Sequence, residues 1–216
     1  MTARRAVVRV AFVVVIAMGA AACSSGSRSS NGNGSPTTRP RPAATFAVIG
    51  TSASVGDGLQ FPLQYSWPRL VFREALPRTT VFVNAAVSGS SAENALHDQV
   101  PLVEQLHPTV VVIWLGAVEV SQLASPVQFE ANLRVVVDGA RSTGARVLLA
   151  DLPAYPKTDV RPYNAVIDDI ARETGVTLVP LHALAVSWLV NEPLFLPDVN
   201  GHRTIATAIE ASLSMK

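Results

Sequence analysis

The stretch TFAVIGTSASVGDG, residues Thr45–Gly58, decides the fold that we expect for this chain. It begins with a short apolar run, Phe46–Ile49, and glycines then lie on both sides of Ser52. An apolar run of this length bounded by glycine indicates a buried strand followed by a tight turn. Ligands of open parallel α/β sheets bind at the edge where the strands end. Ser52 is therefore a candidate functional side chain, although serine and glycine are also ordinary turn residues.

Segments with strand and helix patterns alternate along the rest of the chain. Apolar, β-branched runs that predict further strands lie at 81–84, 109–115, 146–151 and 176–181. Helical patterns or helix-start signals lie at 67–76, 90–106, 126–142, 162–175 and 202–214. This alternation favours a parallel sheet with helices on both faces. We therefore predict a single α/β domain, a three-layer doubly wound sheet of five parallel strands flanked by helices.

The composition limits the number of domains and the class of partner. With 216 residues, of which 49% are apolar, the chain can bury one sizeable core. All 16 acidic residues but only 11 of the 17 basic residues follow residue 44, so this part has a formal charge of about −5. A protein that binds nucleic acid needs a basic face. We therefore expect no nucleic-acid partner.

The first 22 residues have the features of an export signal. Arg4, Arg5 and Arg9 precede the apolar run Val10–Ile16, and small residues follow it. This order is typical of a secretory signal peptide, and the apolar run is shorter than the ~20 residues that a transmembrane helix needs. We therefore predict that residues 1–22 are a signal peptide.

Cys23 follows this segment directly and is the only cysteine in the chain. A single cysteine cannot form an internal disulfide bond. The sequence AAAC at residues 20–23 resembles a bacterial lipobox, in which the cysteine is acylated and becomes the mature N-terminus, although Ala20 stands where leucine is more usual. We expect Cys23 to be lipidated, which would anchor the chain to the outer face of the bacterial cytoplasmic membrane or the cell envelope. Simple cleavage is the alternative.

Residues 23–44 are rich in serine, glycine, asparagine and proline. A segment of this composition has no apolar surface to bury and is typical of a disordered tether. The organisation that we predict is a lipoprotein signal peptide (1–22), a tether (23–44) and one folded domain (45–216).

Two blocks of the folded region resemble the SGNH, or GDSL-type, hydrolases. IGTSASVGDG (49–58) is similar to the first block of that family, with Ser52 at the position of the nucleophile and Thr51 in place of the usual aspartate. VNAAVSGSS (83–91) is similar to the second and carries over Gly89 as the expected backbone donor to an oxyanion. The resemblance implies a flavodoxin-like SGNH-hydrolase fold and a serine esterase or acyltransferase ancestry. We expect no cofactor, and no metal ion because the acidic residues are scattered and lack ligand spacing.

Two further blocks depart from the family pattern. VVIWLGAVEV (111–120) has Val118 where the family has an asparagine that donates to the oxyanion. PLFLPDVNGHRTIA (193–206), aligned without gaps, has Pro193 at the position of the aspartate and Leu196 at that of the catalytic histidine. Neither of these two side chains can accept a proton from serine.

A relocated base is one way to complete the site. Asp198 and His202 could form an Asp-x-x-x-His variant, in which Asp198 orients the ring and His202 accepts the proton of Ser52. The alternative is that His202 caps or flanks the last helix in an exposed position, as its family counterpart does, while Asp198 caps that helix. The remaining histidines are expected to be surface or capping residues: His97, His107 and His182.

Two functions therefore remain open. The first is a membrane-anchored serine ester hydrolase or acyltransferase that acts on acyl esters of envelope carbohydrate or lipid. Ser52 would attack the carbonyl carbon, and the N–H groups of Ser52 and Gly89 would hold the oxyanion. His202, oriented by Asp198, would carry the proton. The second is a catalytically degenerate member that binds a glycan, lipid or protein partner without turnover.

Overall fold

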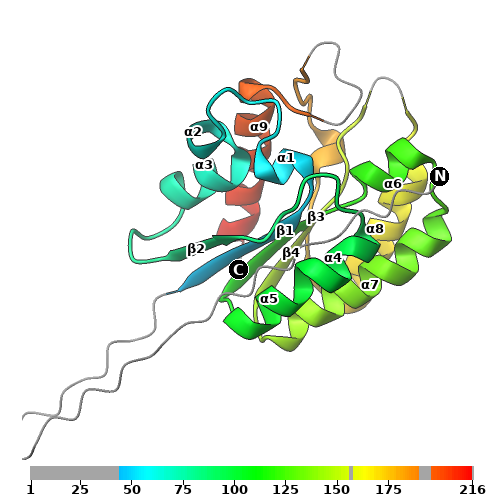
Figure 1. The fold of residues 1–216 in the computed structure, drawn as a ribbon, viewed down its shortest axis with the longest axis horizontal. Helices are drawn as coiled ribbons and strands as arrows, with labels where there is room; N and C mark the ends of the chain where they lie inside the picture. Colours follow the sequence, from blue (N-terminus) through cyan, green and yellow to red (C-terminus); the bar gives the residue numbers. More distant parts are fainter. Residues whose placement is uncertain (1–43, 156–157, 190–195, 216) are drawn as a thin grey trace, which may run out of the picture. The chain divides into compact units, whose positions relative to one another are not determined.

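The computed structural model describes residues 44–155, 158–189 and 196–215 (Figure 1). The predicted signal peptide, most of the predicted tether, Cys23 and Pro193 lie outside the described residues. Within the described part of the chain, no helix has both the length and the apolar character of a membrane span.

Five parallel strands form one sheet in the order β2-β1-β3-β4-β5, which confirms the predicted fold class. They are β1 (Thr45–Gly50), β2 (Val81–Asn84), β3 (Val110–Trp114), β4 (Arg146–Ala150) and β5 (Thr177–Val179). Their apolar, β-branched sequences suit strands that are covered on both faces. The chain reverses its direction along the sheet between β1 and β3, so the turn after β1 lies at the switch point where doubly wound sheets bind ligands.

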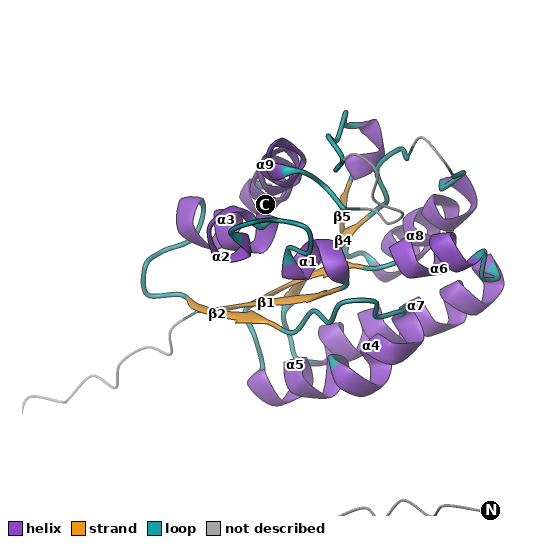
Figure 2. Ribbon diagram, turned by 45° about the horizontal axis from the view of Figure 1, so that its top comes forward, coloured by secondary structure: helices purple, strands orange, loops and turns teal. Residues whose placement is uncertain are grey.

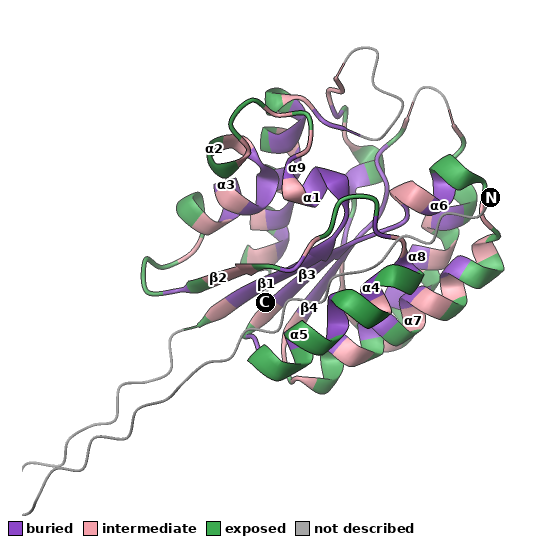
Figure 3. Ribbon diagram, viewed as in Figure 1, coloured by how far each residue is buried: buried purple, intermediate pink, exposed green. Residues whose placement is uncertain are grey.

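Helices cover both faces of this sheet (Figure 2). On one face lie α2 (Pro62–Tyr65), α3 (Trp67–Glu74) and α9 (Val199–Ser214), and on the other lie α4 (Ala92–Asp98), α5 (Val100–Leu106), α7 (Pro126–Ser142) and α8 (Arg161–Thr174). Three short helices follow strands or turns: α1 (Ser52–Val55), α6 (Ala117–Gln122) and the 3₁₀ helix η1 (Leu181–Ala183). The buried residues concentrate in the central strands and on the helix faces that contact them (Figure 3).

Two helix boundaries differ from the sequence-based expectation. The predicted helix 90–106 is divided into α4 and α5 at Gln99, because Pro101 has no N–H to donate to the preceding turn. The last helix begins at Val199 and not at His202, because the Asp198 carboxylate accepts a hydrogen bond from the Gly201 N–H and caps the helix.

Candidate active site

Ser52 lies at the turn between β1 and α1, as the first residue of that helix. Its side chain is largely buried, with 8% of the residue exposed. The turn is so tight that a Cβ atom at Gly50 would collide with the side chain of Ser54. A glycine at the end of β1 thus allows the chain to bend and to present Ser52 at the carboxyl edge of the sheet.

Gly89 lies in the loop between β2 and α4, residues 85–91, which we call the oxyanion loop. Its N–H donates a hydrogen bond of 3.2 Å to Ser52 Oγ. Gly89 has a φ of +74°, in the left-handed region that favours glycine, and this conformation directs the N–H toward the serine. The structure therefore brings the predicted nucleophile and the predicted oxyanion donor together.

Gln99 joins the turn before Ser52 to the oxyanion loop. This side chain is fully buried, and its Oε1 accepts a hydrogen bond of 2.8 Å from the Gly50 N–H. Its Nε2 donates to the Gly50 carbonyl at 3.0 Å and to Ser90 Oγ at 2.9 Å. Ser90 directly follows Gly89, so one buried amide fixes both parts of the site. Sequence reasoning missed Gln99, because no motif places it there.

Glu119 holds the chain directly after the oxyanion loop. Its Oε1 accepts a hydrogen bond of 2.6 Å from the N–H of Ala92, the first residue of α4, and Oε2 is buried without a partner among the described residues. Burial raises the pKa of the Glu119 carboxyl, because the charged form loses its hydration. Glu119 thus links α6, which follows β3, to the helix that follows the loop.

His202 lies against α3 and is fully buried. Its Nδ1 accepts a hydrogen bond of 3.2 Å from the N–H of Trp67, the first residue of α3, and its Nε2 is buried with no partner in the described structure. Burial lowers the pKa of His202 to about 4, so the ring is neutral at neutral pH. The imidazole therefore supplies an acceptor for one of the N–H groups that a helix N-terminus leaves unpaired.

Asp198 does not form the predicted hydrogen bond to the ring of His202. Its carboxylate accepts hydrogen bonds from the Gly201 N–H and the Ser187 hydroxyl. Since Nδ1 of His202 is itself an acceptor, it has no proton to donate to Asp198. The structure places these two residues in the cap of α9 and does not join them into a proton relay with Ser52.

A different histidine is paired with a buried carboxylate. Asp151 directly follows β4 and is fully buried; its two oxygens bind the backbone N–H of His182, at 2.7 Å, and the ring Nδ1 of that residue. The hydrogen bond to Asp151 raises the pKa of His182, and burial raises the pKa of Asp151. Half of the His182 side chain is exposed, toward a cavity of about 370 Å³ that Arg161 and Asp168 also line.

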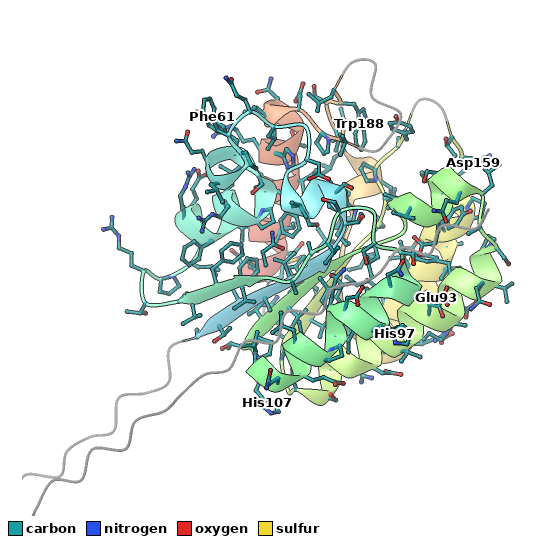
Figure 4. The ribbon with its side chains drawn as sticks, in the orientation of Figure 1. Phe61, Glu93, His97, His107, Asp159 and Trp188 are labelled. Carbon is teal, nitrogen blue, oxygen red and sulfur yellow. The ribbon has the colours of Figure 1, made fainter. Side chains whose placement is uncertain are left out.

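The expected surface position of His182 is confirmed, because half of its side chain is exposed, but sequence reasoning did not pair it with Asp151. The order of the strands could have predicted this pair, because Asp151 follows β4 and His182 follows β5, and these two parallel strands are neighbours in the sheet. The expectation for the other two histidines is confirmed: His97 is exposed on α4, and His107 caps the C-terminus of α5 (Figure 4).

The cavity beside Ser52 has a volume of about 140 Å³ and lies between α1, the oxyanion loop and α6. Val118 of α6 is part of its wall, together with Ala53 and Ala117. A larger cavity, of about 590 Å³, lies among the loops that lead into β4 and β5, at the opposite edge of the sheet. We place the site at Ser52, because doubly wound sheets bind their ligands at the carboxyl edge.

The model of the GDSL-like lipase/acylhydrolase family matches residues 48–203, which include Ser52, the oxyanion loop and Gln99. The chain belongs to this family. Esterase TesA of Pseudomonas aeruginosa is 28% identical over 148 residues, which cover 66% of this chain and 73% of that protein. Thioesterase 1/protease 1/lysophospholipase L1 of Escherichia coli is 29% identical over 145 residues, covering 66% of this chain and 68% of the relative.

Solved structures of other proteins share the fold of this family member. A crystal structure of TesA superposes with a TM-score of 0.67 at 24% identity, covering 79% of this chain and 98% of that one. The acetylxylan esterase Axe2 of Geobacillus stearothermophilus superposes with a TM-score of 0.66 at 18% identity, covering 80% and 95%. At these identities the likeness concerns the fold.

Leu196 stands at the position where the ungapped alignment places the catalytic histidine of the family. The side chain is 6% exposed, and a Cβ atom added to Gly58 would contact it. The main-chain carbonyl of Leu196 accepts a hydrogen bond from the Leu189 N–H. Leu196 is thus a packing residue, and it is not part of the wall of the cavity beside Ser52.

Proposed function

We propose that this chain is an exported, lipid-anchored member of the GDSL-like family that recognises acyl esters of envelope carbohydrate or lipid at Ser52. The observation that carries the proposal is the hydrogen bond between the Gly89 N–H and Ser52 Oγ. A donor in this position can also bind the carbonyl oxygen of an ester that lies over the serine. The names of the two relatives, an esterase and a thioesterase, support acyl groups as the ligand class.

Recognition without turnover is the function that this geometry supports best. Ser52 Oγ has one hydrogen-bond partner among the described residues, the Gly89 N–H, and no histidine reaches it. His202 is held by Trp67. The Val118 side chain has no amide to donate to the oxyanion, and the loss of one such donor typically lowers the rate about 10²–10³-fold. A serine with neither a base nor a second side-chain donor is a poor nucleophile.

Ester hydrolysis or acyl transfer is the second candidate, favoured by the same hydrogen bond between Gly89 and Ser52. In this reaction Ser52 attacks the carbonyl carbon, a base accepts the hydroxyl proton, and the alcohol leaves with a proton from that base. Water or an acceptor hydroxyl then takes the acyl group from Ser52, giving its proton to the base, which returns it to the serine oxygen. His202 could act as this base only if its ring released the Trp67 N–H and turned toward Ser52.

Covalent labelling separates the two functions. The full chain is treated with a fluorophosphonate probe, and labelled peptides are identified by mass spectrometry. Recognition without turnover predicts no labelling of Ser52 within the time that labels a GDSL-type esterase completely. Labelling at Ser52 that is lost in His202→Asn would instead establish hydrolysis with a relocated base. Ser52→Ala controls for labelling elsewhere, and circular dichroism shows whether each variant is folded.

The membrane anchor is tested independently of the site. The formal charge of about −5 after residue 44 disfavours binding to anionic headgroups, so the proposed attachment rests on Cys23. More than one acyl chain is needed for stable anchoring, and a bacterial lipoprotein carries several. We expect the chain to incorporate labelled palmitate and to fractionate with membranes, and Cys23→Ser to abolish both. Membrane association of the Cys23→Ser variant would overturn the lipid anchor.

A further inference from the structure

The cavity beside Ser52 is small compared with the sites of large ligands. Its volume is about 140 Å³, whereas pockets for drug-sized molecules measure roughly 300–1,000 Å³. An apolar cavity of about 150 Å³ holds one benzene molecule, which has six carbon atoms. The space next to Ser52 therefore fits about six non-hydrogen atoms.

Both polar and apolar residues line the cavity: Thr51, Ser52, Ala53, Gly89, Ala117, Val118, Ser121 and Gln122. Ser52 Oγ and the Gly89 N–H form the polar part where an ester carbonyl would bind. Ala53, Ala117 and Val118 supply apolar wall. Two of these three side chains are single methyl groups, which leave room for carbon atoms. An ester whose carbonyl oxygen faces Gly89 thus places its alkyl group against methyl groups.

Size and polarity together identify the acyl group. We propose that the site at Ser52 is selective for short acyl groups, from acetyl to about pentanoyl, and excludes long acyl chains. This inference rests on the proposed function, since it assumes that the ligand is an acyl ester. It adds a role for Val118, which is the branched side chain of the apolar wall. Val118 sets the length of the acyl chain that fits.

Titration with esters of increasing acyl length tests this selectivity without requiring turnover. Methyl acetate, methyl butyrate and methyl octanoate are added to the ¹⁵N-labelled full chain, and the amide resonance of Gly89 is followed. The affinity of the ester should rise about fourfold for each methylene group from acetate to butyrate, because burying a methylene group in an apolar site is favourable by about 0.8 kcal/mol. Octanoate should bind at least tenfold more weakly than butyrate, because its chain exceeds the cavity.

Variants at Val118 test the wall. Val118→Ala removes two methyl groups, so it should enlarge the cavity by about two carbon atoms and reduce the difference in affinity between octanoate and butyrate. Val118→Phe should fill the cavity and remove butyrate binding, with the circular dichroism spectrum unchanged. Val127→Ala is the matched control, because Val127 is a valine of α7 with 75% of its surface exposed, and it should leave every affinity unchanged.

The outcomes distinguish this inference from the function on which it rests. If no ester shifts the Gly89 resonance, acyl-ester recognition is overturned. If octanoate binds as tightly as butyrate and shifts the same resonance, recognition stands and selectivity for short chains is overturned. An unchanged length profile in Val118→Ala would remove Val118 from the wall that limits the chain.

Discussion

Gln99 and Gly50 are joined by two hydrogen bonds that run in opposite directions. The side-chain carbonyl accepts from the Gly50 N–H at 2.8 Å, and the side-chain amide donates to the Gly50 carbonyl at 3.0 Å. A side chain from the start of α5 thus pairs with the end of β1 much as a neighbouring strand would. Because Gln99 also binds Ser90, the turn that holds Ser52 and the oxyanion loop share one support.

Gln99→Leu should weaken both the fold and the site. The variant leaves the N–H and carbonyl of Gly50 without these buried partners, and each lost partner costs about 1–3 kcal/mol. We expect denaturant unfolding to show this loss and methyl butyrate to bind at least tenfold more weakly. Gln128→Leu, an exposed position on α7, is the control and should change neither quantity. Wild-type affinity in Gln99→Leu would show that Gly89 keeps its place without this support.

His202 should make the protein less stable in acid. Its pKa in the folded state is about 4, below the value of 6.5 for the unfolded chain, so the unfolded state binds the extra proton between these values. Stability therefore falls as the pH falls from 6.5 to 4, by about 3 kcal/mol in total. His202→Asn retains an acceptor for the Trp67 N–H but does not titrate. Unfolding free energies measured from pH 7 to pH 4 should fall less steeply in this variant.

The pair formed by His182 and Asp151 predicts a pKa that can be measured directly. The hydrogen bond to Asp151 raises the pKa of His182 above 6.5, so the paired, protonated ring stabilises the fold below pH 6.5 and this contribution is lost as the pH rises through the folded pKa. NMR titration of the His182 ring should give a value above 6.5. In Asp151→Asn the pKa should move down toward 6.5. A pKa of 6.5 or less in the wild type would contradict the assignment.

Introducing the residues of the family motif tests the ungapped alignment. Val118→Asn, Leu196→His and Pro193→Asp together supply a donor, a base and an orienting carboxylate, the three groups that the alignment finds replaced. The ungapped alignment predicts hydrolysis of 4-nitrophenyl butyrate at least tenfold above that of the natural chain, lost again when Ser52→Ala is added, whereas the packing of Leu196 away from the cavity wall predicts no gain. A folded triple variant with no gain would count against the ungapped alignment.

The sheet was predictable because its signals are local, whereas the pairing of Ser52 with Gly89, 37 residues apart, was predictable only from the resemblance to a family. Runs of β-branched residues specify buried strands, and glycine marks the turns after β1 and in the oxyanion loop. Gln99 and His182 were not predictable in this way, because their partners lie 49 and 31 residues away in the sequence. Only the packing of strands and helices brings such groups together.

His202 shows a second limit of sequence reasoning. The sequence around a histidine at a helix start does not show whether its ring faces solvent, a serine or another helix. The fully buried position against α3 follows from how α3 and α9 pack on one face of the sheet (Figure 2). The role of His202 as an acceptor for Trp67 is therefore a property of the tertiary fold.

The support of the oxyanion loop has a consequence for the thermodynamics of binding. Gln99 holds Ser90, Glu119 holds Ala92, and the Val87 N–H donates to the Gly50 carbonyl, so the loop is fixed on both sides of Gly89. A preorganised site loses little conformational entropy when a ligand arrives. Small esters, which make few contacts, can then bind without a cost in free energy for ordering the loop. A ligand of another shape cannot improve its contacts through a rearrangement of this loop.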